Sequence, residues 1–350
     1  MSTSNLIETA ALKKLMGVAS NEAMLSVNED VQYLYDTLAP TIAVKKASGD
    51  AYVLEVNDAL GYQNDLITPR SVPNEVGGEY RKTTYTTDEY AIRMMVTDKD
   101  IEVYGSRTML VQQATRTVTS VLRGNMELRF FNTFFNKTAG WKTTFDGQDT
   151  ASNIETGKIQ YWDNDASDPI KDIDAMKEKN AKYLGNTKLN RAVIAKDVWN
   201  ALKNHPDIAP RLQGSSKDIK VDRALQTEFA KLIEVERVDV IDYMSGVHID
   251  KVRDITLDST PEKTYTRQLK GVFMLYRYED ARTLQNKAAF NIIDVPSNMV
   301  SFNRGIPKLE MYPHHDRGVR AFWVDGRIGA GLHLSNPAGL VFCEKMLKNA

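Results

Sequence analysis

The longest regular pattern of apolar and polar positions lies between Gly105 and Asn136, a stretch that contains no proline. Five apolar side chains recur there with the spacing of one helical face: Val111, Ala114, Val118, Val121 and Leu122. Four polar side chains fall on the opposite arc: Arg116, Ser120, Arg123 and Glu127. Over 130–135 the pattern becomes apolar on nearly all sides, as expected where a helix end enters a core. The pattern predicts a helical rod of roughly 45–50 Å that serves as a spine.

Before this helix, the pattern changes to that of an extended strand. Glu79–Val96 is rich in threonine and tyrosine, and its second half alternates along the chain. Its first half is polar on both faces, so its own core would not bury it, and an isolated two-stranded ribbon is marginal in water. Two interpretations stay open: an arm that packs against another chain, or a strand in the surface sheet of a monomer. The preceding stretch, 47–78, is weakly apolar and rich in Gly, Asn, Asp and Pro, which favours a functional segment or one that packs on something else.

After the spine, helices and strands are mixed without regular βα alternation, which predicts an α+β fold. The expected helices cover 170–183, 198–205 (with Asp197 as N-cap), 221–233 and a short tail helix over 338–347. The expected strands cover 191–195, 235–241, 271–278 and 319–332, the last with glycine-rich turns.

Composition narrows the functional classes. The chain has 350 residues, of which 42% are hydrophobic and 26% charged, as in a soluble globular protein of about two domains. Lys+Arg 45 against Asp+Glu 46 leaves a net charge of −1, which argues against a strongly basic nucleic-acid clamp. No secretory signal or membrane-length apolar run is present in the sequence. The single cysteine, Cys343, excludes an intramolecular disulfide and any multi-cysteine zinc site.

Candidate catalytic features are weak. Gly326–Gly331 resembles a phosphate-binding loop but lies among strand-like residues, so turn glycines are the better interpretation. His314, His315 and Asp316 would bind a metal or relay a proton only if they converged, and a solvated turn is favoured over that. Cys343 is interpreted as a buried thiol in the tail helix.

Other polar groups have structural explanations. Asp98, Asp100 and Glu102 lack the glycine of a calcium loop and are interpreted as a solvated face before the spine. His205, His248 and His333 are isolated and interpreted as structural. We therefore expect no catalytic residues, no metal and no cofactor, and a protein that is not an enzyme.

The order of segments carries a family resemblance. It consists of LAPTIAV at Leu38–Val44, Thr68–Arg70, the strand from Glu79, the spine, SDPI at Ser167–Ile170, and NRAVIAKDVWNALKNHPDI at Asn190–Ile208. Together these segments, which extend over most of the chain, resemble the major capsid protein of a tailed bacteriophage with the Hong Kong 97-like fold. The resemblance implies an N-terminal arm, an extended E-loop, a peripheral (P) domain with a long spine helix, and an axial (A) domain.

On this template the chain divides into five parts. They are the arm and lead-in strand at 1–45, the E-loop at 46–92, the P-domain at 93–188 with spine 105–136, the A-domain at 189–307, and a C-terminal return to the P-domain at 308–350.

The resemblance implies a virion location, assembly in the host bacterial cytoplasm, and closed shells of pentamers and hexamers. The shell would enclose double-stranded DNA without sequence-specific binding and without a membrane. A separate scaffolding protein and a portal protein would be partners, with a cementing protein as a further candidate, and assembly would be noncovalent. Expected inter-subunit contacts are Arg81, Lys82, Tyr85, Arg116, Arg123 and Glu127. Two alternatives stay open: an encapsulin-like nanocompartment shell, and a soluble α+β enzyme using His314, His315 and Asp316.

Overall fold

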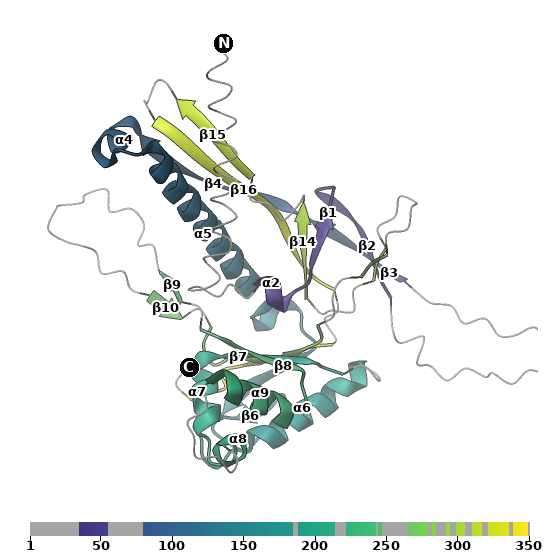
Figure 1. The fold of residues 1–350 in the computed structure, drawn as a ribbon. Helices are drawn as coiled ribbons and strands as arrows, with labels where there is room; N and C mark the ends of the chain where they lie inside the picture. The colour runs from purple at the N-terminus through teal and green to yellow at the C-terminus, as the bar shows by residue number, and fades with distance from the viewer. Residues whose placement is uncertain are drawn as a thin grey trace, which may run out of the picture.

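The structure is a computed structural model of the full chain (Figure 1). It describes residues 35–54, 80–184, 188–213, 222–242, 244–246, 265–267, 269–278, 282–284, 292–294, 299–304, 310–316, 321–335 and 339–348. These residues form two main sheets joined by one long helix, a mixed helix-and-sheet fold (Figure 1).

The first sheet has five strands, and its longest strand, β16, pairs with three others. Along the order β1-β14-β16-β15, β4 also pairs with β16. The bounds are β1 (Thr41–Val44), β4 (Asp88–Thr97), β14 (Met299–Arg304), β15 (Glu310–Asp316) and β16 (Ala321–Leu334). The alternation of β4 places Tyr90, Ile92, Met94 and Val96 toward the long helix α5 (Arg107–Phe134), which crosses this face of the sheet (Figure 1).

Helix α5 confirms that a long helix was correctly predicted here, with ends within two residues of 105 and 136, and we continue to call it the spine. Its 28 residues correspond to a rod of about 42 Å. Ser106 caps its N-terminus by accepting a hydrogen bond from the Met109 amide at 3.3 Å. Gly105, with φ 74°, ends the preceding helix α4 (Asp98–Tyr104) in the left-handed conformation that favours glycine. The turn between the two helices is therefore encoded locally.

The spine connects two hydrophobic cores. Val111, Ala114, Val118 and Leu122 form one core with residues of β4 and β16. From Met126 onward, the helix belongs to the larger core of the second sheet, which includes Phe130, Phe131, Phe134 and Phe135. The prediction that this helix end enters a core is confirmed.

The second sheet has six strands in the order β6-β5-β17-β11-β7-β8. These are β5 (Thr143–Gln148), β6 (Lys158–Gln160), β7 (Arg191–Ala195), β8 (Arg237–Ile241), β11 (Phe273–Tyr276) and β17 (Val341–Glu344). The associated helices are α6 (Pro169–Leu184), α7 (Lys196–Asn204), α8 (Ala209–Gln213) and α9 (Asp222–Leu232), which lie below the sheet in Figure 1.

The remaining described elements are short. They are α2 (Tyr35–Leu38), the ribbon strands β2 (Ser48–Leu54) and β3 (Tyr80–Thr86), the 3₁₀ turn η1 (Lys137–Ala139), β9 (Met244–Gly246), β10 (Tyr265–Arg267), β12 (Arg282–Leu284) and β13 (Ile292–Asp294). The predicted helices at 170–183, 198–205 and 221–233 are confirmed, as are the three strands at 191–195, 235–241 and 271–278, with shifted ends.

Three local predictions were wrong. The tail helix over 338–347 is instead strand β17, because its apolar run pairs with both β11 and β5 inside the second sheet. Within the segment predicted as a strand with glycine-rich turns, the described part is one continuous strand, Ala321–Leu334, without turns. Asp197 does not cap α7: Ala195 occupies that position, while Asp197 accepts the Gly271 amide at 2.8 Å and so holds α7 against the start of β11.

Candidate assembly surface

The strands β2 and β3 form an antiparallel ribbon at one side of the molecule (Figure 1). Ser48 pairs with Thr86 at its root, and Leu54 pairs with Tyr80 at the far end of the described part. Among the described strands, β2 and β3 pair through their backbones only with each other. From Asp88 onward the chain pairs with β16 instead, so the ribbon pairing ends at Thr86.

Three of the predicted contact residues belong to this ribbon. Arg81 and Lys82 lie in β3 opposite Val53 and Tyr52, but their side chains lie outside the described part of the structure. Tyr85 is only 2% exposed and stacks on Phe302 of β14, with ring centroids 4.6 Å apart. The chain thus buries Tyr85 against its own body, and its part in a contact between subunits stays a prediction.

The three predicted residues on the spine lie in different surroundings. Arg116 is exposed, whereas Arg123 and Glu127 are buried. Glu127 is fully buried and accepts the Tyr35 amide at 2.9 Å, which attaches α2 to the spine. The part of Arg116, Arg123 and Glu127 in contacts between subunits stays a prediction. Val121, placed on the buried face, is 39% exposed.

The largest exposed apolar side chains gather where α4 meets α5, at the end of the spine away from the second sheet (Figure 1). Val103, Tyr104 and Met109 are 69%, 67% and 59% exposed, and we call these three residues the corner patch. The corner is held by a capping box in which Thr97 and Asp100 exchange hydrogen bonds. These bonds hold the pKa of the Asp100 carboxyl below its usual range. An apolar group on a rigid support is typical of an interaction site.

The outer face of the first sheet carries an aromatic and charged group. Arg93 of β4 makes a bidentate ion pair with Asp325 of β16, at 2.6 and 2.8 Å. The guanidinium also lies 5.1 Å from the ring centroid of Trp323, which pairs in register with the exposed Met95. Arg93 is exposed and Trp323 half-buried, and arginine and aromatic side chains are enriched in protein interfaces.

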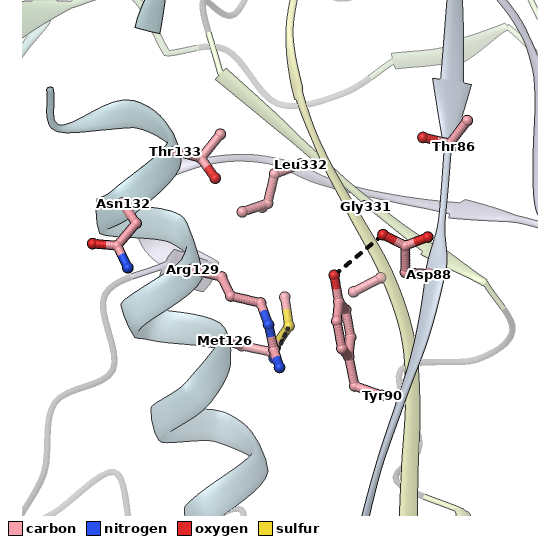
Figure 2. A pocket seen from close by; sticks show the side chains of 10 residues that line it. Thr86, Asp88, Tyr90, Met126, Arg129, Asn132, Thr133, Gly331 and Leu332 are labelled. Carbon is pink, nitrogen blue, oxygen red and sulfur yellow. Dashed lines mark hydrogen bonds between the residues drawn. The ribbon is translucent and has the colours of Figure 1, made fainter. Parts of the chain in front are cut away.

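A pocket of about 360 Å³ lies between the spine and the ribbon root. Figure 2 shows its lining: Thr86, Asp88 and Tyr90 from the ribbon end and β4, Met126, Arg129, Asn132 and Thr133 from α5, and Ala330, Gly331 and Leu332 from β16. The Arg129 guanidinium lies 3.7 Å from the centroid of the Tyr90 ring, and the Tyr90 hydroxyl donates to Asp88 at 3.5 Å. These contacts connect the spine to the start of β4.

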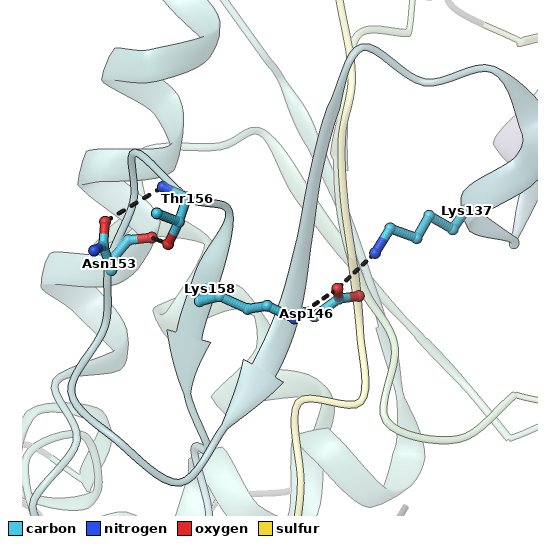
Figure 3. A network of polar contacts seen from close by, with 5 residues as sticks. All are labelled: Lys137, Asp146, Asn153, Thr156 and Lys158. Carbon is cyan, nitrogen blue, oxygen red and sulfur yellow. Dashed lines mark hydrogen bonds and ion pairs between the residues drawn. The ribbon is translucent and has the colours of Figure 1, made fainter.

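A polar network follows the end of the spine (Figure 3). Lys137 and Lys158 both donate to Oδ2 of Asp146, at 2.5 and 3.0 Å. Burial disfavours the charged carboxylate, but the two lysines outweigh it and hold the pKa of Asp146 below its usual range. Burial and the hydrogen bond with Asp146 raise the pKa of Glu344, its neighbour on β17. The network joins η1 to three strands, and its charges are neutralised within the chain.

The glycines and the His-His-Asp group that the sequence offered for chemistry all lie in β-strands. Gly326 and Gly331 let other elements approach β16 closely. A Cβ on Gly326 would lie 2.4 Å from Val118 Cγ1 of α5. They are therefore not turn glycines. His314, His315 and Asp316 lie in β15 rather than in a turn, where neighbouring residues alternate between faces. The described residues contain no group of three or more side chains arranged to hold a metal ion.

Two further candidates are buried. Cys343 is a buried thiol, as predicted, but it lies in a strand beside Met176, and burial raises its pKa. His205 Nε2 lies 3.2 Å from Ser167 Oγ, which superficially resembles a nucleophile and its base. However, His205 Nδ1 accepts the Asp207 amide, so Nε2 carries the proton and cannot remove one from the serine. His333 lies in β16 near Phe302, while His248 lies outside the described residues.

Asp98, Asp100 and Glu102 form part of α4, where Asp98 and Glu102 are exposed, as the prediction of a solvated face before the spine expected. Within the described part of the chain, no helix combines the length and apolar composition that crossing a bilayer requires.

Comparison with known proteins gives similarity at the level of structure. No protein-family model matches the chain, and no curated protein matches its sequence. A phage-related protein from Bordetella bronchiseptica RB50 is 14% identical, with 94% of this chain and 96% of that one covered, at a TM-score of 0.62. The chain is also similar to the capsid of a native GTA particle, with 12% identity, 89% of each chain covered and a TM-score of 0.49. It is similar to the capsid of cyanophage P-SCSP1u as well, with 8% identity, 88% of this chain and 86% of that one covered, and a TM-score of 0.49. The chain therefore shares the fold of the Bordetella phage-related protein over nearly the whole length of both.

Proposed function

We propose that the chain is the major capsid protein of a tailed phage, a subunit that self-assembles into a closed icosahedral shell. The observation that carries this proposal is the fold shared with a phage-related protein across 94% of the chain. The family resemblance carried by the sequence segments supports the same function.

The described geometry supports assembly through two regions. The ribbon β2–β3 forms no backbone pairs with a third described strand, although β13 lies against β2, so its unpaired edge groups can bond to a neighbouring copy. We propose that it lies across the outer face of the neighbour's first sheet, near Arg93 and Trp323. The corner patch, at the other end of the spine, supplies a second contact. Two different surfaces that meet in a repeated rotation produce rings, as pentamers and hexamers require.

The near-neutral charge fits a shell that contains DNA without binding it tightly, since each neutralised phosphate strengthens binding in low salt. The proposal includes noncovalent assembly in the host bacterial cytoplasm, with a separate scaffolding protein and a portal, and a cementing protein as a possible outer partner. The E-loop, P-domain and A-domain limits stated above belong to the same proposal.

The test is electron microscopy and analytical ultracentrifugation of the purified chain over a range of concentrations. We expect icosahedral shells or ring-shaped capsomers. A uniform 39.4 kDa monomer at high concentration would contradict the proposal.

The contents of particles isolated from the producing bacterium separate a virion from a nanocompartment. Double-stranded DNA, protected from nuclease until the shell is opened, is expected for a capsid. A folded enzyme in place of DNA would instead identify the encapsulin-like alternative. For the enzyme alternative, His314→Ala would have to abolish a turnover while leaving assembly intact.

A further inference from the structure

We propose that Tyr85 is a positioning residue that sets the angle at which the β2–β3 ribbon leaves the body, and thereby the curvature of the shell. The part concerning curvature rests on the proposed function. The part concerning the angle rests only on the contacts at the ribbon root.

The ribbon needs such a support. Two paired strands are marginally stable and twist readily, so the direction of a two-stranded ribbon depends on contacts at its base. At this base, the Thr87 amide and hydroxyl both donate to the Ala47 carbonyl, at 2.7 and 3.0 Å. These two bonds hold the two strands together at the root, but they do not attach the ribbon to the sheet.

Tyr85 makes that attachment. It pairs in register with Gly49, and its ring covers this glycine so closely that a Cβ there would lie 2.7 Å from the Tyr85 Oη. The same ring stacks on Phe302 of β14 with an interplanar angle of 17°. Phe302 belongs to the five-stranded sheet, so one aromatic ring contacts both the ribbon and the body.

A second close contact limits rotation at the same place. A Cβ on Gly331 of β16 would lie 2.0 Å from the carbonyl oxygen of Thr86, the last residue of β3. Backbone therefore crosses backbone directly beside Tyr85. The stacked ring and the backbone crossing both restrict the ribbon at its root, while β13 lies against β2.

A small change of the angle at the root is amplified along the length of the ribbon. Its seven-residue strands are roughly 20 Å long, so a rotation of about 10° at the root moves the far end by about 4 Å. In a closed shell each copy repeats the same contact, and a repeated change of angle alters or prevents closure.

The experiment compares the full-length wild type with Tyr85→Ala, Tyr85→Leu, Tyr85→Phe and Val118→Ala. Tyr85→Phe keeps the stacked ring. Val118→Ala removes buried apolar volume from the spine and leaves the ribbon root unchanged. It therefore controls for a loss of stability that does not involve the root. Particle diameters are measured by electron microscopy after assembly under identical conditions, and melting temperatures are measured in parallel.

We expect Tyr85→Ala to give a shifted or broader diameter distribution, or capsomers that do not close, while Tyr85→Phe and Val118→Ala keep the wild-type diameter. Tyr85→Leu keeps apolar volume at this position but lacks the flat ring. We expect it to shift or broaden the diameter distribution too, so it tests the inference even if Tyr85→Ala does not fold. Wild-type diameters for a folded Tyr85→Ala or Tyr85→Leu would overturn the inference.

A second readout does not depend on assembly. Spin labels at Asp50→Cys on β2 and Lys99→Cys on α4 report the ribbon-to-body distance in the unassembled chain, with the buried Cys343 left unlabelled. The distance distribution should broaden with Tyr85→Ala and Tyr85→Leu but not with Tyr85→Phe. If the wild type forms no particles, the proposed function fails. An unchanged distance distribution in Tyr85→Ala and Tyr85→Leu would overturn the separate inference that Tyr85 sets the ribbon angle.

Discussion

Phe130 offers a direct test of the conclusion that the spine helix is built into the second core. The side chain is fully buried, and its ring contacts three others of the same helix end: Phe134 at a centroid distance of 5.0 Å, and Phe131 and Phe135 at 6.0 Å. Truncation to alanine removes the whole ring from this aromatic group. We expect Phe130→Ala to lower the free energy of unfolding by about 3–5 kcal/mol.

Two further variants of the same helix provide controls for the loss of unfolding free energy expected from Phe130→Ala. Phe130→Leu keeps most of the apolar volume and is expected to cost less than about 1.5 kcal/mol. Val121→Ala, on the same helix but 39% exposed, should change the free energy of unfolding by less than about 0.5 kcal/mol. The three variants therefore separate burial in the core from a general effect on the helix.

The assay is denaturant unfolding followed by tryptophan fluorescence, at protein concentrations low enough to keep the chain unassembled. Trp141, Trp162 and Trp199 all belong to the same core as Phe130, so they report the unfolding of that core. A loss below about 1 kcal/mol for Phe130→Ala would refute the assignment, since it would mean that the helix end is not packed there.

Three further predictions concern the pH response, a thiol and the corner patch. Lys196 holds the pKa of the Asp222 carboxyl below its usual range, so this group stabilises the fold above its unfolded pKa and loses that effect as pH falls through the folded pKa. Asp222→Asn should therefore cost about 0.2–1 kcal/mol at pH 7 and less in acid, and equal losses measured by denaturation at both pH values would contradict this. Cys343 should react with a thiol reagent only after denaturant is added, because it is buried and its pKa is raised; rapid labelling of the folded chain would show that the strand is open. Tyr104→Ser should leave the melting temperature nearly unchanged but raise the concentration needed for assembly in sedimentation, and unchanged assembly would remove the corner patch from the proposed contacts.

Patterns that depend on neighbours in the chain were predictable. The spine helix follows from its apolar spacing and from the absence of proline, and the alternation over Tyr90–Val96 identifies the strand. The buried state of Cys343 was also predictable from its type, although the secondary structure around it was not. A short apolar run at 341–343 suits a helix or a strand equally, and only pairing with β5 and β11 makes it a strand.

The candidate site was less predictable, since its contacts join residues far apart in the sequence. Glu127 is charged, yet it is fully buried, and α2 covers it and supplies its hydrogen-bond donor. Tyr85 lies in a strongly polar segment, yet Phe302 stacks on it. No spacing along the chain signals either partner.

Sequence alone determined the long helix, the extended strand before it and the family resemblance, because periodicity and segment order are properties of the chain itself. Tertiary structure decided which arc of the spine is buried, since its covering changes from β4 and β16 near Val118 to α2 and the second core near Glu127. It also decided the use of Gly326 and Gly331, whose missing side chains matter only where a helix or another strand approaches within van der Waals distance. The physical reason is the same in each case: burial depends on which surfaces meet, and the chain's local pattern specifies a surface without specifying its partner.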